Sequence, residues 1–174
     1  LAQPYRSDTV SALCKRGAKL VSAPYPLGVE GTLAWFQAAA AEWGVGAESV
    51  KESLAIPIAR AQKSLAKARE SLQDRTIHFL PDSQLELPLA RFLRDECGMS
   101  LMEVATPYLD QTLMAEEMLR LGPGVSLVEG SDLDSALARV RHNRPDLTVC
   151  GMGIANPLEA EGLRTKWSIE LIFP

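Results

Sequence analysis

Short apolar runs alternate with amphipathic patterns of helical period from Thr76 onward, and this alternation limits the possible folds more than any other feature. Each run has the length of a buried strand, and glycines follow the helical patterns where helices usually end. Four strands alternating with three helices predict an α/β fold, a Rossmann-like parallel sheet flanked by helices. The expected strands cover 76–80, 101–106, 125–128 and 146–150, and the expected helices cover 84–97, 111–121 and a segment capped by Ser131.

The first half of the chain predicts a partial second α/β unit and a long linking helix. The partial α/β unit would contain helices over 7–16 and 32–43 and a short strand over 19–23. A Ser49–Glu52 capping box starts the linking helix, and Pro57 is expected to kink or restart it. The predicted division is 1–47 for the carboxyl-side part of a Rossmann-like unit, 48–74 for the linking helix and 75–174 for a Rossmann-like domain.

Composition excludes several classes of protein. The 174 residues carry a net charge of −4, so the basic surface typical of nucleic-acid binding is missing. No run approaches the roughly 20 apolar residues that a transmembrane helix needs. Three widely spaced cysteines favour a reducing cytoplasm and give no metal-binding signature. A start at Leu1, without a charged and apolar leader, leads us to expect a cytoplasmic fragment of a longer chain.

Motifs for nucleotides and metals are incomplete. Gly151-x-Gly153 follows a strand, but Asn156 stands where the dinucleotide motif has its third glycine, and no P-loop sequence occurs. His78 is interpreted as a core residue and His142 as a cation at a helix end, because neither has a second ligand at zinc spacing.

Polar side chains cluster where the first predicted strand ends. Asp82, Ser83 and Gln84 would face a crevice at the carboxyl edge of the sheet, where such folds bind ligands. Ser83 and Glu86 also form a capping box, so helix capping is the alternative role, and Pro88 suggests that the regular helix begins late. Glu159 and Glu161 are further acids, and nothing in the sequence raises their pKa.

Two aromatic residues follow the last predicted strand, Trp167 and Phe173, after a small-residue loop that begins at Gly151. Spacing alone favours core packing for both, with ligand contact as the alternative.

Several long motifs resemble one family, the N subunit of light-independent (dark-operative) protochlorophyllide reductase, a nitrogenase-like enzyme of bacteriochlorophyll and chlorophyll biosynthesis in photosynthesis. The resemblance extends over essentially the whole chain. It rests on FLPDSQLELPLARFL (Phe79–Leu93) and on Glu96–Met99, Ala105–Pro107, Pro145–Gly151, Ala155–Ala160, Thr165–Trp167 and Ile169–Leu171.

This resemblance implies an oxidoreductase in which N pairs with a homologous B subunit as an N2B2 heterotetramer. A transient L protein, an iron–sulfur ATPase, would deliver electrons through a [4Fe–4S] cluster to protochlorophyllide, whose ring-D C17=C18 bond is reduced. The family's cluster ligands lie outside this chain, so Cys14, Cys97 and Cys150 are not expected to bind metal. No catalytic residue is expected here, and the fragment alone should be inactive.

The site residues implied by the resemblance form a pocket wall. Trp167 matches a tryptophan placed against the flat macrocycle and Phe173 a second aromatic, while Asn156 is a further candidate substrate contact. The family continues with Thr-Pro after this phenylalanine, whereas here Phe173 meets Pro174 directly.

Two alternatives accompany this prediction. One is a subunit of another nitrogenase-like complex, such as chlorophyllide reductase or a cofactor-assembly scaffold. The other is a small-ligand module that resembles periplasmic metal-chelate-binding proteins.

Overall fold

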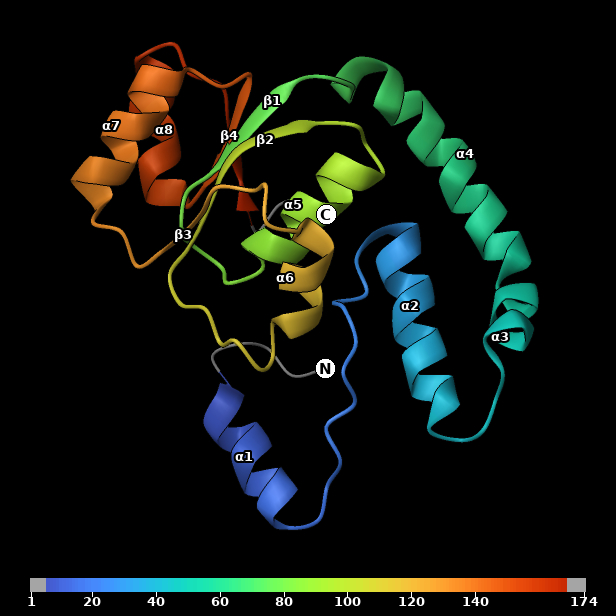
Figure 1. Cartoon of the computed structure of the whole chain (residues 1–174). Helices are drawn as coiled ribbons and strands as arrows, with labels where there is room; N and C mark the ends of the chain where they lie inside the picture. The colour runs from blue at the N-terminus through green and yellow to red at the C-terminus, as the bar shows by residue number, and fades with distance from the viewer. Residues whose placement is uncertain (1–5, 169–174) are drawn as a thin grey trace.

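A five-stranded parallel sheet is the centre of the fold in the computed structural model, which describes residues 6–168 (Figure 1). The strand order is β3-β2-β1-β4-β5, and each neighbouring pair is parallel. The strands are β1 (Thr76–Phe79), β2 (Ser100–Thr106), β3 (Leu127–Glu129), β4 (Leu147–Cys150) and β5 (Thr165–Trp167).

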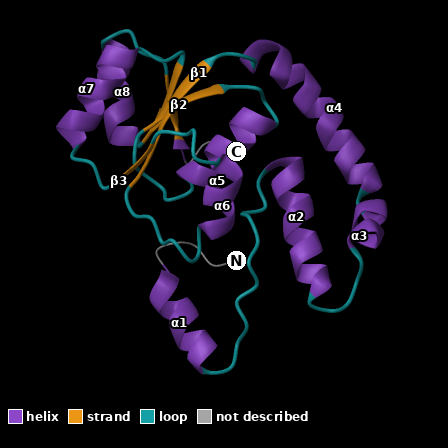
Figure 2. Cartoon of the chain, in the orientation of Figure 1, coloured by secondary structure: helices purple, strands orange, loops and turns teal. Residues whose placement is uncertain are grey.

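Helices cover both faces of the sheet (Figure 2). The helices α5 and α6 lie on one side, α7 and α8 on the other, and α2, α3 and α4 form an outer group beyond α5. The bounds are α1 (Ser7–Lys15), α2 (Gly28–Ala41), α3 (Ala47–Ser53), α4 (Ala55–Leu72), α5 (Glu86–Asp95), α6 (Ala115–Leu121), α7 (Leu133–Asn143) and α8 (Met152–Ala160).

Two apolar clusters hold these layers together. Ile77 and Phe79 pack with α5 residues such as Leu89 on one face. Leu80 and Cys150 pack with residues of α7 and α8 on the other face. Alternate strand residues point to opposite faces, so a sheet covered on both sides needs the continuous apolar strands seen in this sequence.

The α/β fold class and the four expected strands are confirmed, with no strand end shifted by more than two residues. The segment after Cys150 differs from its prediction as a loop. It forms α8 and then a fifth strand, β5. Gly153 and Pro157 suggested a loop, but Ala155 and Leu158 bury one side of a short helix against the sheet.

One predicted strand is absent, and two predicted helix caps are wrong. Residues 18–27 form no strand, and near the end of this segment the Tyr25 backbone bonds to side chains of α5 and α6 rather than to a sheet edge. Helix α3 begins at Ala47, so Ser49 lies within it and is no cap. Asp132, not Ser131, caps α7 by accepting from the Ser135 amide.

The linking segment is two helices rather than one. The helix α3 ends at Ser53 and α4 begins at Ala55, with Leu54 between them outside regular helical geometry. Pro57 stands in the first turn of α4, where a missing N–H costs nothing, so its predicted restart of the helix is confirmed. The division of the chain into three parts at these boundaries stays a prediction.

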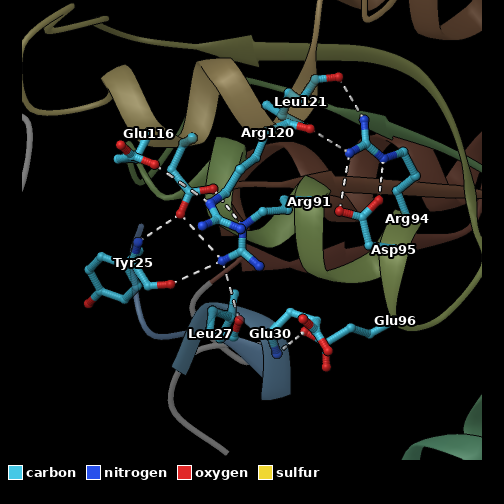
Figure 3. Close-up of polar contacts among 11 residues, drawn as sticks. Tyr25, Leu27, Glu30, Arg91, Arg94, Asp95, Glu96, Glu116, Arg120 and Leu121 are labelled. Carbon is cyan, nitrogen blue, oxygen red and sulfur yellow. Dashed lines mark hydrogen bonds and ion pairs between the residues drawn. The ribbon is translucent and has the colours of Figure 1, made fainter. Parts of the chain in front are cut away.

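A buried ion pair docks the first part of the chain on α5 and α6 (Figure 3). Arg91 Nε lies 2.7 Å from Glu117 Oε2, and Arg91 is only 2% exposed. Arg91 Nη2 also donates to the carbonyls of Tyr25 (3.0 Å) and Leu27 (3.3 Å), and the Tyr25 amide donates to Glu117 (2.7 Å). These contacts satisfy both buried charges and fix the segment that leads into α2.

Candidate functional site

The direction in which strands are added to the sheet reverses between β1 and β4, which makes this point of the carboxyl edge a topological switch point. From β1 the chain runs outward through β2 to β3, and from β4 it runs the other way to β5. The loops that follow β1 and β4 therefore leave in opposite directions, which is where open α/β sheets bind ligands.

The loop after β1 forms a nest of backbone amides, and that nest already holds a carboxylate. Glu86 Oε1 accepts from the amides of Asp82 (3.0 Å), Ser83 (2.5 Å) and Gln84 (3.1 Å). Thr106 Oγ1 donates to the other oxygen, and Glu86 is almost fully buried. Because such nests bind anions, Glu86 takes the place that a phosphate group would need.

This arrangement confirms half of the predicted capping box. Glu86 reaches back to the Ser83 amide as expected. The Ser83 hydroxyl accepts from the Leu85 amide instead of the third helical residue, because α5 begins only at Glu86. Pro88 thus lies in the first turn, in agreement with a late helix start.

Asp82 joins the ends of three strands. It follows β1, its Oδ2 accepts from the Ser168 hydroxyl just after β5, and it lies against Gly151 just after β4. A Cβ atom on Gly151 would lie 2.7 Å from Asp82 Oδ1, so a larger residue there would displace the carboxylate. No local pattern in the sequence signals this contact.

Trp167 is the last residue of β5 and pairs in register with Cys150 of β4. Its ring is partly buried against the apolar cluster of α7 and α8. Asn156 is exposed on α8, next to the buried Ala155. Phe173 lies outside the described residues.

Other acids near this edge have structural partners. Glu159 accepts from Thr165 Oγ1 at 2.6 Å, and Glu161 forms a two-bonded pair with Arg141 on the surface. The Arg141 guanidinium holds the pKa of Glu161 below its usual range. Neither acid is set up as a proton donor.

His78 is a core residue, as predicted, and it lies beside Glu103 of β2. Burial lowers the pKa of His78, although Glu103, 3.4 Å from Nε2, opposes the shift. Among the described residues neither ring nitrogen has a hydrogen-bond partner, and neither does the neighbouring Thr148 hydroxyl. His142 lies exposed in the last turn of α7, at the predicted helix end.

The cysteines do not fit a metal cluster. Cys14 is exposed, while Cys97 and Cys150 are buried in different apolar clusters. Burial raises the pKa of the Cys150 thiol to about 11, with Asp82 and Glu159 adding to the effect, so this thiol stays protonated near neutral pH. Within residues 6–168, no group of three or more His, Cys, Asp or Glu side chains could hold a metal.

An apolar cavity of about 580 Å³ lies elsewhere, between α2, α4 and α5. Leu33, Ile58 and Phe92 are among its lining residues, and it shares none of them with the carboxyl-edge loops. Its walls offer no convergent set of polar groups of the kind that orients a reactant.

Comparisons with known proteins identify the family. The family model for nitrogenase component 1 type oxidoreductase matches residues 2–165. The chain is 59% identical over 172 residues to light-independent protochlorophyllide reductase subunit N of Halorhodospira halophila, covering 99% of this chain and 41% of that protein. It is 54% identical to the subunit of the same name in a Synechococcus species, covering 99% of this chain and 40% of that protein. The resemblance seen in the sequence is thereby confirmed.

A solved structure described as nitrogenase Cp1 at pH 5 has the same fold. The TM-score is 0.65 at 15% identity, over 81% of this chain and 35% of that one. The chain spans about 40% of the length of its curated relatives. In the part of the chain that the structure describes, no helix is long and apolar enough to cross a membrane. The extent of the family match leaves no room for the alternative of a periplasmic chelate-binding module, and we conclude that the chain belongs to the nitrogenase component 1 type oxidoreductases.

Proposed function

We propose that the chain is part of the N subunit of light-independent protochlorophyllide reductase. The observation that carries this proposal is the 59% identity, over nearly the whole chain, to a relative of that name. Further relatives with 51–55% identity have the same name rather than that of a chlorophyllide reductase subunit. The function is therefore preferred over that of another nitrogenase-like complex.

The proposed reaction is the ATP-dependent reduction of the ring-D C17=C18 bond of protochlorophyllide, in a cytoplasmic N2B2 complex. A B subunit would complete the catalytic unit, and an L protein would hydrolyse ATP and deliver electrons. A [4Fe–4S] cluster would relay the electrons, but residues 6–168 do not fit a cluster site, so we assign its ligands elsewhere. This chain would contribute scaffold and pocket wall and no catalytic group.

Trp167 is the pocket residue that the geometry supports best. It lies at the carboxyl edge of the sheet and is only partly buried, so part of the ring is available to a ligand. A flat, apolar macrocycle can pack on an indole ring over a large area. Phe173 and Asn156 complete the proposed wall. Asn156 is exposed on α8, and Phe173 follows six residues after Trp167.

A pigment titration of the assembled full-length N–B complex tests this function. We expect Trp167→Ala to weaken protochlorophyllide binding at least tenfold, or about 1.4 kcal/mol, without loss of assembly. Trp43→Ala is the matched control, since Trp43 is 79% exposed in the turn after α2 and should leave the affinity unchanged. Unchanged binding by Trp167→Ala would assign Trp167 to the core, and a wild-type complex that binds no pigment would overturn the function itself.

A further inference from the structure

We propose that Asp82 is a positioning residue for pigment binding, because it fixes the end of β5 that carries Trp167. The proposal rests on the function proposed above. It assigns to Asp82 a hydrogen bond that orients the pocket wall, and no contact with the reacting atoms.

The tether connects two distant parts of the chain. Ser168 directly follows Trp167, is only 2% exposed and donates its hydroxyl proton to Asp82 Oδ2. Asp82 comes 86 residues earlier, in the loop between β1 and α5. The hydrogen bond therefore spans the sheet from β1 to β5 across the intervening β4.

Asp82 is itself held in place from two sides. Its amide donates to Glu86 Oε1 at 3.0 Å, within the anion-filled nest described above. Its carboxylate fits against Gly151, where a Cβ atom would approach Oδ1 to 2.7 Å. A carboxylate fixed by the loops after β1 and β4 can act as a rigid anchor for a third element.

The strand β5 needs such an anchor. Within residues 6–168 it has three residues, lies at the edge of the sheet and pairs with β4 alone. Short edge elements with few partners open at lower free energy than the core of a sheet. Trp167 is the last residue of this strand, so small displacements of the strand end move the indole ring directly.

A purely structural carboxylate at the opposite end of the sheet provides a matched control. Asp146 precedes β4 and accepts from the amide (2.8 Å) and hydroxyl (2.9 Å) of Thr76 at the start of β1. Like Asp82, it connects strand ends, but at the amino edge, far from Trp167. Asp146→Ala should lower the thermal midpoint of the complex and leave its affinity for pigment unchanged.

The test is a double-mutant cycle on the full-length N–B complex, with protochlorophyllide binding measured from the absorbance of the pigment. Asp82→Ala and Ser168→Ala should each weaken binding about fivefold, which is about 1 kcal/mol. The double variant should be no weaker than either single variant, because both remove the same interaction. Asp82→Asn should bind nearly as well as wild type, since its amide oxygen still accepts from Ser168.

The outcomes separate this proposal from the proposed function. If Trp167→Ala weakens binding while Asp82→Ala and Ser168→Ala do not, the function stands and the positioning role is overturned. Additive losses in the double variant would also overturn it. If Asp82→Ala fails to assemble, Ser168→Ala and Asp82→Asn carry the test alone. Wild-type complex without pigment affinity would overturn the proposed function, and this inference with it.

Discussion

Glu96 caps a helix to which it does not belong. Its two oxygens accept from the amides of Val29 (2.6 Å) and Glu30 (3.2 Å) at the start of α2, although the residue itself follows α5. A carboxylate at this position satisfies amides that have no partner within α2 and favours the positive end of the helix dipole. Burial nevertheless raises the pKa of Glu96, because loss of solvation outweighs these two hydrogen bonds.

The raised pKa predicts a pH dependence of stability. Between the ordinary value of 4.5 and the raised value, the folded state binds more protons at Glu96 than the unfolded state. The contribution of Glu96 to the free energy of unfolding therefore falls as pH rises through this window. Glu96→Gln should remove this slope, measured as thermal midpoints between about pH 4 and pH 7. Glu48→Gln, on the exposed first turn of α3, should keep the wild-type slope; an unaltered slope in Glu96→Gln would contradict the prediction.

Some side-chain environments could be predicted from the sequence, and others could not. The burial of His78 follows from its strand pattern, and the Ser83–Glu86 contact follows from local spacing. The Asp82–Ser168 and Glu96–Val29 contacts join residues 86 and 67 positions apart. Only the tertiary structure brings such pairs together, so no sequence pattern could have predicted them.

Helix α8 illustrates why one element escaped prediction. Pro157 removes an amide that would otherwise bond to the carbonyl four residues earlier, at Gly153, and both residues are usually found in loops. The helix forms because Ala155 and Leu158 bury its inner side against the sheet. Packing against the sheet outweighs the weak helix propensity of this segment. The helix α5 could be predicted, because its apolar residues recur with a helical period over a longer stretch.

The start of α2 predicts a difference between two glycines. Gly28 and Gly44 both have positive φ angles (74° and 70°), so alanine at either position carries a backbone cost of roughly 1–2 kcal/mol. A Cβ atom at Gly28 would also collide with Glu96 and Phe92, whereas Gly44 faces open space. We expect Gly28→Ala to lower the free energy of unfolding by about 3 kcal/mol or more, since it also displaces the Glu96 cap. Urea denaturation measures both variants, and equal losses would show that Glu96 and Phe92 move aside freely.

The attachment of the outer helices to the sheet predicts unequal effects for two similar ion pairs. Arg91–Glu117 and Arg141–Glu161 both have 2.7 Å contacts, but the first pair is buried and the second is about half exposed. Arg91→Ala should cost about 3–5 kcal/mol, because it leaves the Glu117 charge buried and unpaired. Arg141→Ala should cost far less, because an ion pair on the surface gains little over its solvated ions.

Chemical denaturation measures the free energy of unfolding of these two variants. A double variant that combines Arg91→Met with Glu117→Leu serves as a control. The double variant should be more stable than Arg91→Ala, since it removes both charges. If Arg91→Ala and Arg141→Ala lowered the free energy of unfolding by similar amounts, the buried Arg91–Glu117 pair would not be what holds the first part of the chain in place.

The overall fold could be predicted from the sequence because strand and helix patterns alternate regularly after Thr76. Right-handed crossovers between parallel strands then allow only a few topologies. The predicted strand at 19–23 failed for a reason that concerns the whole molecule. That segment has strand-like composition but pairs with none of the described strands. The residues just after it, Tyr25 and Leu27, are held instead by the side chains of Arg91 and Glu117, which local sequence cannot reveal.

The strand order also determines when this protein can fold during synthesis. The strand β1 lies between β2 and β4, and its contact with the β4 region waits for residues 70 positions later in the chain. Until the ribosome has released Leu147 to Cys150, one edge of the central strand β1 has no partner. Pairings of such long sequence separation are slow, and unpaired apolar edges invite association with other chains. The nascent chain therefore passes through a vulnerable interval that ends only when β4 inserts beside β1 and completes the centre of the sheet.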